Sequence, residues 1–166
     1  MNFLEKNLED IIFENKELLS DRGLVNIFYK NTKRQVIMPF GRKIDMLTWG
    51  IVDDVIYARI IELKKDCVGY NALYQSVQCY IDFIATISGY FKDYKIEIVL
   101  IGDCVSGDIK DIGCTSDLFR FFDYTYKLDG IYFREYHQNC SYLKSVFNKL
   151  TKDEAAKPFI ASLVNL

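Results

Sequence analysis

The chain has 166 residues with a formal net charge of −2, and 50% of them are hydrophobic, 15% aromatic and 27% charged. This composition is typical of a folded domain and excludes a disordered or fibrous chain. No apolar run approaches the roughly 20 residues that cross a bilayer, and the first residues do not resemble a secretory signal. We therefore expect one cytoplasmic domain over residues 1–166 with no membrane association.

The hydrophobic pattern of the first half predicts one helix followed by extended segments. Leucines and isoleucines recur at helical spacing over residues 2–20, and Gly23 is a suitable C-terminal cap. Four strands are then predicted, at residues 24–29, 35–38, 42–48 and 55–64. A loop is predicted at 49–54, between the last two strands. The apolar run of the last strand is typical of a central strand buried on both faces.

The second half continues with a long helix over residues 70–90 and a strand over residues 96–101. A strand, a crossover helix and a strand in this order imply a parallel pair. A short helix over 115–122, a hairpin over 124–135 with an Asp-Gly turn, and a weakly patterned helical tail over 140–166 complete the prediction. This order of elements predicts a single α/β domain.

The five cysteines are odd in number, and no two form a Cys-x-x-Cys pair. A zinc site and a disulfide framework are therefore poor interpretations, and we expect reduced thiols. The cysteines lie at positions 67, 79, 104, 114 and 140.

Charged residues at the end of the strongest strand indicate a chemical site. Glu62 and Lys64 are two residues apart, so they point to the same face of strand 55–64. Asp45 lies on the preceding extended segment, and a hairpin would place its carboxylate beside Glu62. Two adjacent carboxylates repel each other, which either raises the pKa of one of them or recruits a cation, and an oxygen-only site suits Mg²⁺ or Mn²⁺. The carbonyl of Leu63 is a further candidate ligand.

Two helices flank this predicted site. Glu9, or Glu5 one turn before it, is a candidate ligand or water-holding group on the first helix. Gln75 on the helix after the strand is a candidate for orienting a water or a phosphate oxygen. The alternatives are a solvated helix edge for Glu9 and a backbone cap for Gln75.

Four segments together resemble the PD-(D/E)xK nuclease superfamily, most closely its branch of single-strand and branched-DNA endonucleases. They are LEDII at 8–12, GRKIDML at 41–47, IIELKK at 60–65 and ALYQ at 72–75. The resemblance covers roughly residues 4–102. It implies a restriction-endonuclease-like fold, which is a mixed central sheet flanked by helices.

The resemblance also implies roles for individual residues. Asp45 and Glu62 would be metal ligands, Lys64 the catalytic lysine, Glu9 the helix-borne acid and Gln75 the supporting amide. Cys79 stands where the branch carries a tyrosine after its glutamine, which makes Gln78 the alternative amide.

DNA, single-stranded or branched, is the implied partner, and a homodimer is one option. Residues 21–65 carry nine basic and five acidic side chains, which permits a polyanionic partner, although ordinary surface charge is the simpler explanation. Candidate contacts are Arg42, Lys43 and Lys65, with charge protection of an exposed strand edge as the alternative for the first two.

We therefore predict a Mg²⁺- or Mn²⁺-dependent deoxyribonuclease, an endonuclease of DNA repair or defence. The alternatives are a catalytically silent nuclease-fold module that binds nucleic acid or protein, and a ribonuclease. His137 is the only histidine, which argues against histidine-based nucleases, and no phosphate-cradling glycine loop is present. The aromatic residues between 119 and 126 are interpreted as core packing rather than as a base-stacking surface.

Overall fold

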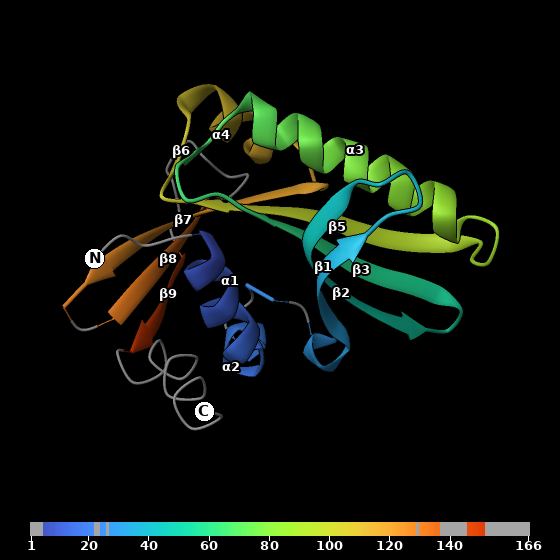
Figure 1. Cartoon of the computed structure of the whole chain (residues 1–166), viewed down its shortest axis with the longest axis horizontal. Coiled ribbons are helices and arrows are strands. Elements are labelled where there is room, and N and C mark those ends of the chain that lie inside the picture. Colours follow the sequence, from blue (N-terminus) through green and yellow to red (C-terminus); the bar gives the residue numbers. More distant parts are fainter. Residues whose placement is uncertain (1–4, 22–23, 26, 129, 137–145, 152–166) are drawn as a thin grey trace.

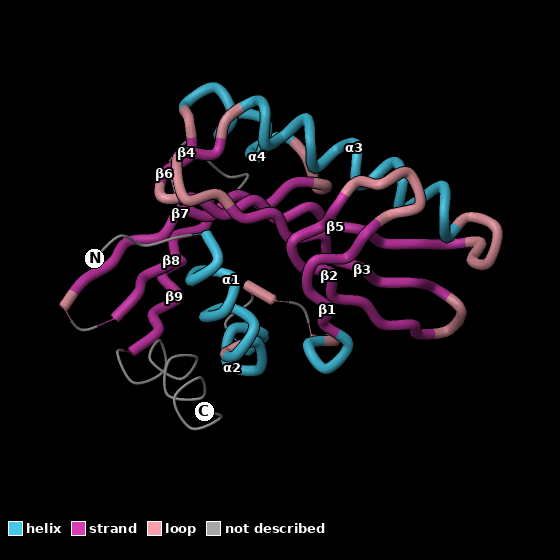
Figure 2. The backbone as a smooth tube through the Cα atoms, viewed as in Figure 1, coloured by secondary structure: helices cyan, strands magenta, loops and turns pink. Residues whose placement is uncertain are grey.

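The computed structural model describes residues 5–21, 24–25, 27–128, 130–136 and 146–151. A seven-stranded sheet with helices on both faces organises these residues (Figures 1 and 2). The helices are α1 (Glu5–Glu14), α2 (Lys16–Asp21), the 3₁₀ turn η1 (Tyr29–Asn31), α3 (Tyr70–Ile87) and α4 (Gly107–Thr115). The strands are β1 (Thr32–Ile37), β2 (Lys43–Val52), β3 (Val55–Leu63), β4 (Cys67–Val68), β5 (Asp93–Gly102), β6 (Cys104–Val105), β7 (Phe119–Lys127), β8 (Gly130–Tyr136) and β9 (Val146–Thr151).

The strands of the main sheet run in the order β1-β2-β3-β5-β7-β8-β9. The three central strands β3, β5 and β7 are parallel, and the outer strands pair antiparallel. α3 connects β3 to β5, and α4 lies between β5 and β7, as crossover connections require. The predicted fold class, a mixed α/β sheet flanked by helices, is confirmed.

Each face of the sheet has its own apolar core. On one face, α1 contributes Leu8, Ile11 and Ile12, which pack against residues such as Ile61 of β3. On the other face, α3 packs against Ile60, the neighbour of Ile61 along the strand. Figure 1 shows α1 and α2 on the opposite side of the sheet from α3 and α4. This explains why β3 is apolar at nearly every position, as predicted.

The aromatic residues of β7 belong mainly to these cores. Phe121 and Phe122 are fully buried on opposite faces of the strand, and Tyr124 is almost fully buried. Their burial confirms the packing interpretation for these three residues, whereas Tyr126 is 46% exposed. Among the described residues, we find no helix with the length and apolar character needed to cross a membrane.

Three predictions for the first half differ from the structure. The predicted helix over 2–20 is divided at Asn15 into α1 and α2. The described residues among 24–29 do not form a strand, because Leu24 and Val25 fill the core under α1 and Phe28 covers Gly50 of β2. A Cβ atom at Gly50 would lie 2.1 Å from the Phe28 ring, so this contact needs glycine. The predicted loop at 49–54 is instead a continuation of β2, and the hairpin closes at Asp53 and Asp54, which both have positive φ.

The second half also differs from the prediction in two places. The helix α4 lies at 107–115 rather than at 115–122, and the aromatic run that follows pairs with β5 as strand β7. Residues 146–151 form strand β9 on β8, although a helical tail was predicted. The predicted hairpin is confirmed as β7–β8, while Asp129 of its turn, His137 and most of the tail lie outside the described residues.

Candidate active site

The hairpin β2–β3 brings Asp45 beside Glu62. Met46 pairs with Ile61, so the next residues outward are these two acids. Both side chains are buried, with 8% and 4% of the residue surface exposed, and they share a hydrogen bond. The amide of Leu63 donates a second hydrogen bond, 2.9 Å long, to Oδ2 of Asp45. The two carboxyl groups are therefore held together at the C-terminal end of β3.

This environment changes the ionisation of Glu62. Burial, as the main cause, and the charge of Asp45 together raise the pKa of Glu62 to about 8, against the opposing effect of Lys64. Oε1 of Glu62 is buried and has no hydrogen-bond partner. A buried carboxylate oxygen without a partner is costly, and a bound cation would satisfy it.

The donor set fits a small hard cation. Mg²⁺ is commonly held by one or two carboxylates, with water and substrate oxygens completing its shell. Asp45 and Glu62 supply two carboxylates, and the main chain of Leu63 lies against them. Within the described part of the chain, no group of three or more His, Cys, Asp or Glu side chains forms a metal site.

An open pocket of about 490 Å³ brings Lys64 and Gln75 together. Lys64 is half-buried at the end of β3, where its amide donates to the carbonyl of Ile101. Gln75 is exposed on the second turn of α3, and the exposed Lys65 lines the same pocket. One pocket is therefore lined by three residues of the predicted site: Lys64, Gln75 and Lys65.

Glu9 is buried on α1, but its contacts are with strand β1. Nε of Arg34 donates to one of its oxygens over 2.6 Å, and the side-chain amide of Gln35 donates to the other over 2.5 Å. The guanidinium of Arg34 also pairs with Asp10. Both Glu9 oxygens are therefore already engaged, which favours a structural role over the predicted role as an acid of the site, a role that the structure does not test.

Arg42 and Gln78 are joined to each other rather than to the carboxyl pair. Arg42 donates to Asp82 over 2.7 Å and to Gln78 over 3.0 Å, which ties the start of β2 to α3. Hydrogen bonding to Asp82 raises the pKa of Arg42. The adjacent Lys43 is exposed. These bonds give Arg42 a structural partner, and Gln75 is the amide that shares a pocket with Lys64.

No known protein family profile matches the chain. A search of curated proteins finds no match either. A solved structure of a repair endonuclease from Pyrococcus abyssi is similar to this one, with a TM-score of 0.49 and 18% sequence identity. The similarity covers 73% of this chain and 46% of that chain, so this chain spans less than half the length of that endonuclease.

Cys79 lies next to the carboxyl pair. The sequence indicated only that a cysteine stands here in place of the tyrosine of the nuclease pattern, and it did not predict this contact. Its thiol lies on the buried face of α3, contacts Glu62 and donates to the carbonyl of Lys43 over 3.7 Å. Burial, as the main cause, and the nearby charges of Glu62 and Asp82 together raise the pKa of the Cys79 thiol to about 12. At neutral pH the thiol is therefore a protonated donor beside Glu62 rather than a nucleophile.

The expectation that all cysteines are reduced is wrong for one pair. Cys67 and Cys104 form a disulfide, with their Cα atoms 4.4 Å apart. They follow the parallel strands β3 and β5, whose ends lie side by side, so the short strands β4 and β6 bring them opposite each other. A Cβ atom at Gly102 would lie 2.6 Å from the Asp66 carbonyl oxygen, so the two connections pass in close contact here.

Proposed function

We propose that the protein is a Mg²⁺- or Mn²⁺-dependent deoxyribonuclease that hydrolyses DNA phosphodiester bonds, acting in DNA repair or defence. One observation carries the proposal. Asp45 and Glu62 form a buried carboxyl pair with an unpartnered oxygen, and Lys64, whose charge acts on Glu62, lines an open pocket that the two acids themselves do not line. The resemblance of the surrounding segments to PD-(D/E)xK nucleases supports DNA as the substrate.

In this proposal Asp45 and Glu62 are the metal ligands, together with the carbonyl of Leu63. The bound ion would polarise a phosphoryl oxygen and lower the pKa of a coordinated water. The amide of Leu63 keeps Asp45 oriented, which preserves the geometry of the pair between turnovers.

Lys64 has the most direct role in the reaction. Lys64 lines the pocket, and in this proposal its ammonium group holds the attacking water and offsets negative charge on the phosphate. Gln75 lines the same opening and orients a water or a phosphate oxygen, and Lys65 contacts the DNA backbone. Arg42 and Lys43 are proposed to contact the backbone more weakly, because Arg42 is already paired with Asp82.

The test is a cleavage assay with Mn²⁺ on plasmid, single-stranded and branched DNA, with RNA of matched sequence alongside. Wild type is compared with Glu62→Gln and with Glu14→Gln, which changes an exposed glutamate on α1. We expect wild type and Glu14→Gln to cut DNA and Glu62→Gln to be inactive while folded. Full activity of Glu62→Gln would refute the mechanism, and cleavage of RNA alone would assign a ribonuclease.

A further inference from the structure

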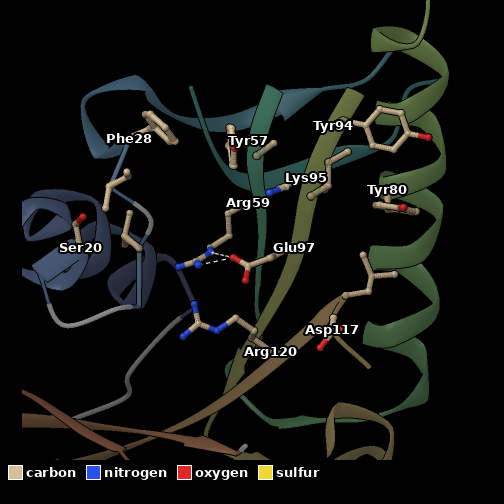
Figure 3. A pocket seen from close by; sticks show the side chains of 15 residues that line it. Ser20, Phe28, Tyr57, Arg59, Tyr80, Tyr94, Lys95, Glu97, Asp117 and Arg120 are labelled. Atoms are coloured by element: carbon tan, nitrogen blue, oxygen red, sulfur yellow. Dashed lines mark hydrogen bonds and ion pairs between the residues drawn. The ribbon is translucent and has the colours of Figure 1, made fainter. Parts of the chain in front are cut away.

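A second cavity, of about 860 Å³, is lined by the first halves of the central strands β3 and β5, away from the strand end that carries Glu62 (Figure 3). Its strand residues include Tyr57 of β3, five residues before Glu62 and therefore roughly 16 Å away along the strand. β5 pairs with β7 only from Ile98 onward. The cavity therefore opens beside the first part of β5, where β7 has not yet begun, and its size suits a small organic ligand.

Positively charged groups gather on one side of this cavity. The guanidinium of Arg59 is buried and donates to Glu97 over 2.9 Å and to the Leu24 carbonyl over 3.0 Å. Arg120 of β7 lies near Arg59 in Figure 3, and its Nε donates a hydrogen bond of 2.6 Å to Glu135. Burial and the positive charge of Arg120 lower the pKa of Arg59, because the two guanidinium groups lie close together.

Basic side chains outnumber acidic ones by one among the lining residues, and Glu135, outside the lining, pairs with Arg120. Among the described residues that line the cavity, Arg59, Arg120 and Lys95 face two acids, Glu97 and Asp117. Glu97 already accepts hydrogen bonds from Arg59. An anion entering the cavity would therefore meet guanidinium groups that the protein has positioned in advance.

The remaining walls are aromatic. Phe28 and Tyr57 lie with their ring centres 6.0 Å apart, and the ammonium of Lys95 lies over the Tyr57 ring. Tyr80 of α3 and Tyr94 of β5 line the opposite side in Figure 3, and Tyr94 is 40% exposed. Flat rings next to fixed cations are the combination that proteins use to bind a base together with its phosphate.

We propose that this cavity binds a nucleoside 5′-phosphate, with its base on the tyrosines and its phosphate toward Arg59 and Arg120. The ligand is either a free nucleotide or one unit of a single strand. An added protein strand on the open edge of β5 would use backbone hydrogen bonds and would not need this cluster of cations. The site is separate from the carboxyl pair, so the inference does not depend on the proposed nuclease activity.

The test uses the full chain in EDTA, so that binding is measured without cleavage. Calorimetry compares 5′-AMP, adenosine, inorganic phosphate and a short single-stranded oligodeoxyadenylate. Tyr94→Ser and Lys95→Gln change exposed lining residues, and Tyr90→Ser and Lys92→Gln are matched controls on the exposed turn outside the cavity. Urea unfolding establishes that all four variants are folded.

We expect AMP to bind more tightly than adenosine or phosphate alone, because base and phosphate contacts add within one site. Each lining variant should weaken AMP binding by about five-fold or more, which is the smallest loss of affinity expected when one base-stacking contact is removed. The two control variants should bind AMP as tightly as wild type. Competition of the oligonucleotide with AMP would identify a single strand as the ligand, and its failure to compete would identify a free nucleotide. Absence of AMP binding, or binding that neither lining variant weakens, would overturn the proposal and favour a protein strand on β5.

Discussion

The amide of Leu63 donates a 2.9 Å hydrogen bond to Oδ2 of Asp45, so the strand that carries Glu62 also fixes the carboxylate opposite it. This bond joins two strands that are separated by a hairpin closing at Asp53 and Asp54. The position of Asp45 therefore depends on the register of the whole hairpin. A shift of one residue would turn Asp45 to the other face of the sheet.

Lys64 is the residue whose loss should separate catalysis from metal binding. Lys64→Gln is expected to lower the cleavage rate by about 100-fold or more, because charge at the phosphate is no longer offset. Mn²⁺ affinity and the unfolding midpoint should stay close to wild type, since Lys64 is only half-buried. Lys92→Gln is the control, at an exposed site outside the pocket. Equal cleavage rates for the two variants would contradict the role given to Lys64.

The pH dependence of stability should report the raised pKa of Glu62. In metal-free protein the folded-state pKa of about 8 exceeds the ordinary value of 4.5, so folding favours the protonated acid. Relative to Glu62→Gln, wild type is then most stable below pH 4.5. It should lose roughly 1.4 kcal/mol per pH unit as the pH rises toward 8.

Urea unfolding of wild type and Glu62→Gln in EDTA at a series of pH values measures this difference. The control Glu14→Gln should show no such trend, because Glu14 is exposed. A difference between wild type and Glu62→Gln that does not change with pH would mean that Glu62 is not buried as described.

Glu9 offers a test of a structural against a catalytic role. Glu9→Gln should lower the free energy of unfolding by about 1–3 kcal/mol, because Arg34 and Gln35 lose a charged acceptor. The folded fraction should retain its cleavage rate within about three-fold, a change of less than 1 kcal/mol. Loss of cleavage without loss of stability would instead assign Glu9 to the active site.

The disulfide between Cys67 and Cys104 should contribute measurably to stability. It closes a loop with a sequence separation of 37 residues, for which chain-entropy estimates give about 2–4 kcal/mol. Cys67→Ser, or addition of a reductant, should lower the urea midpoint, and reductant should then have no further effect on Cys67→Ser. Thiol titration of unfolded protein should find two more thiols after reduction. An unchanged count would show that the bond is absent.

The central part of the fold could be predicted because its signals are local. β3 and β5 are nearly continuous apolar runs, and α3 repeats apolar residues at helical spacing between them. The proximity of Asp45 and Glu62 followed from alternation along two neighbouring strands. By contrast, Leu24 and Val25 look like part of a strand but fill the core under α1, and no local pattern distinguishes the two cases.

Other features of the site depend on contacts between elements that are distant in sequence. Arg42 finds Asp82 only because the start of β2 lies against α3. Cys79 contacts Glu62 for the same reason, and spacing alone could not show it. The disulfide had a usable signal, since both cysteines follow closely on strands predicted to be parallel neighbours.

The central claim is that Asp45 and Glu62 together hold a divalent cation. Titration calorimetry of Mn²⁺ into wild type and into the double variant Asp45→Asn, Glu62→Gln tests it most directly. We predict saturable binding to wild type and none to the double variant, with both proteins folded by circular dichroism. Absence of binding to wild type, or equal binding to both proteins, would contradict the claim.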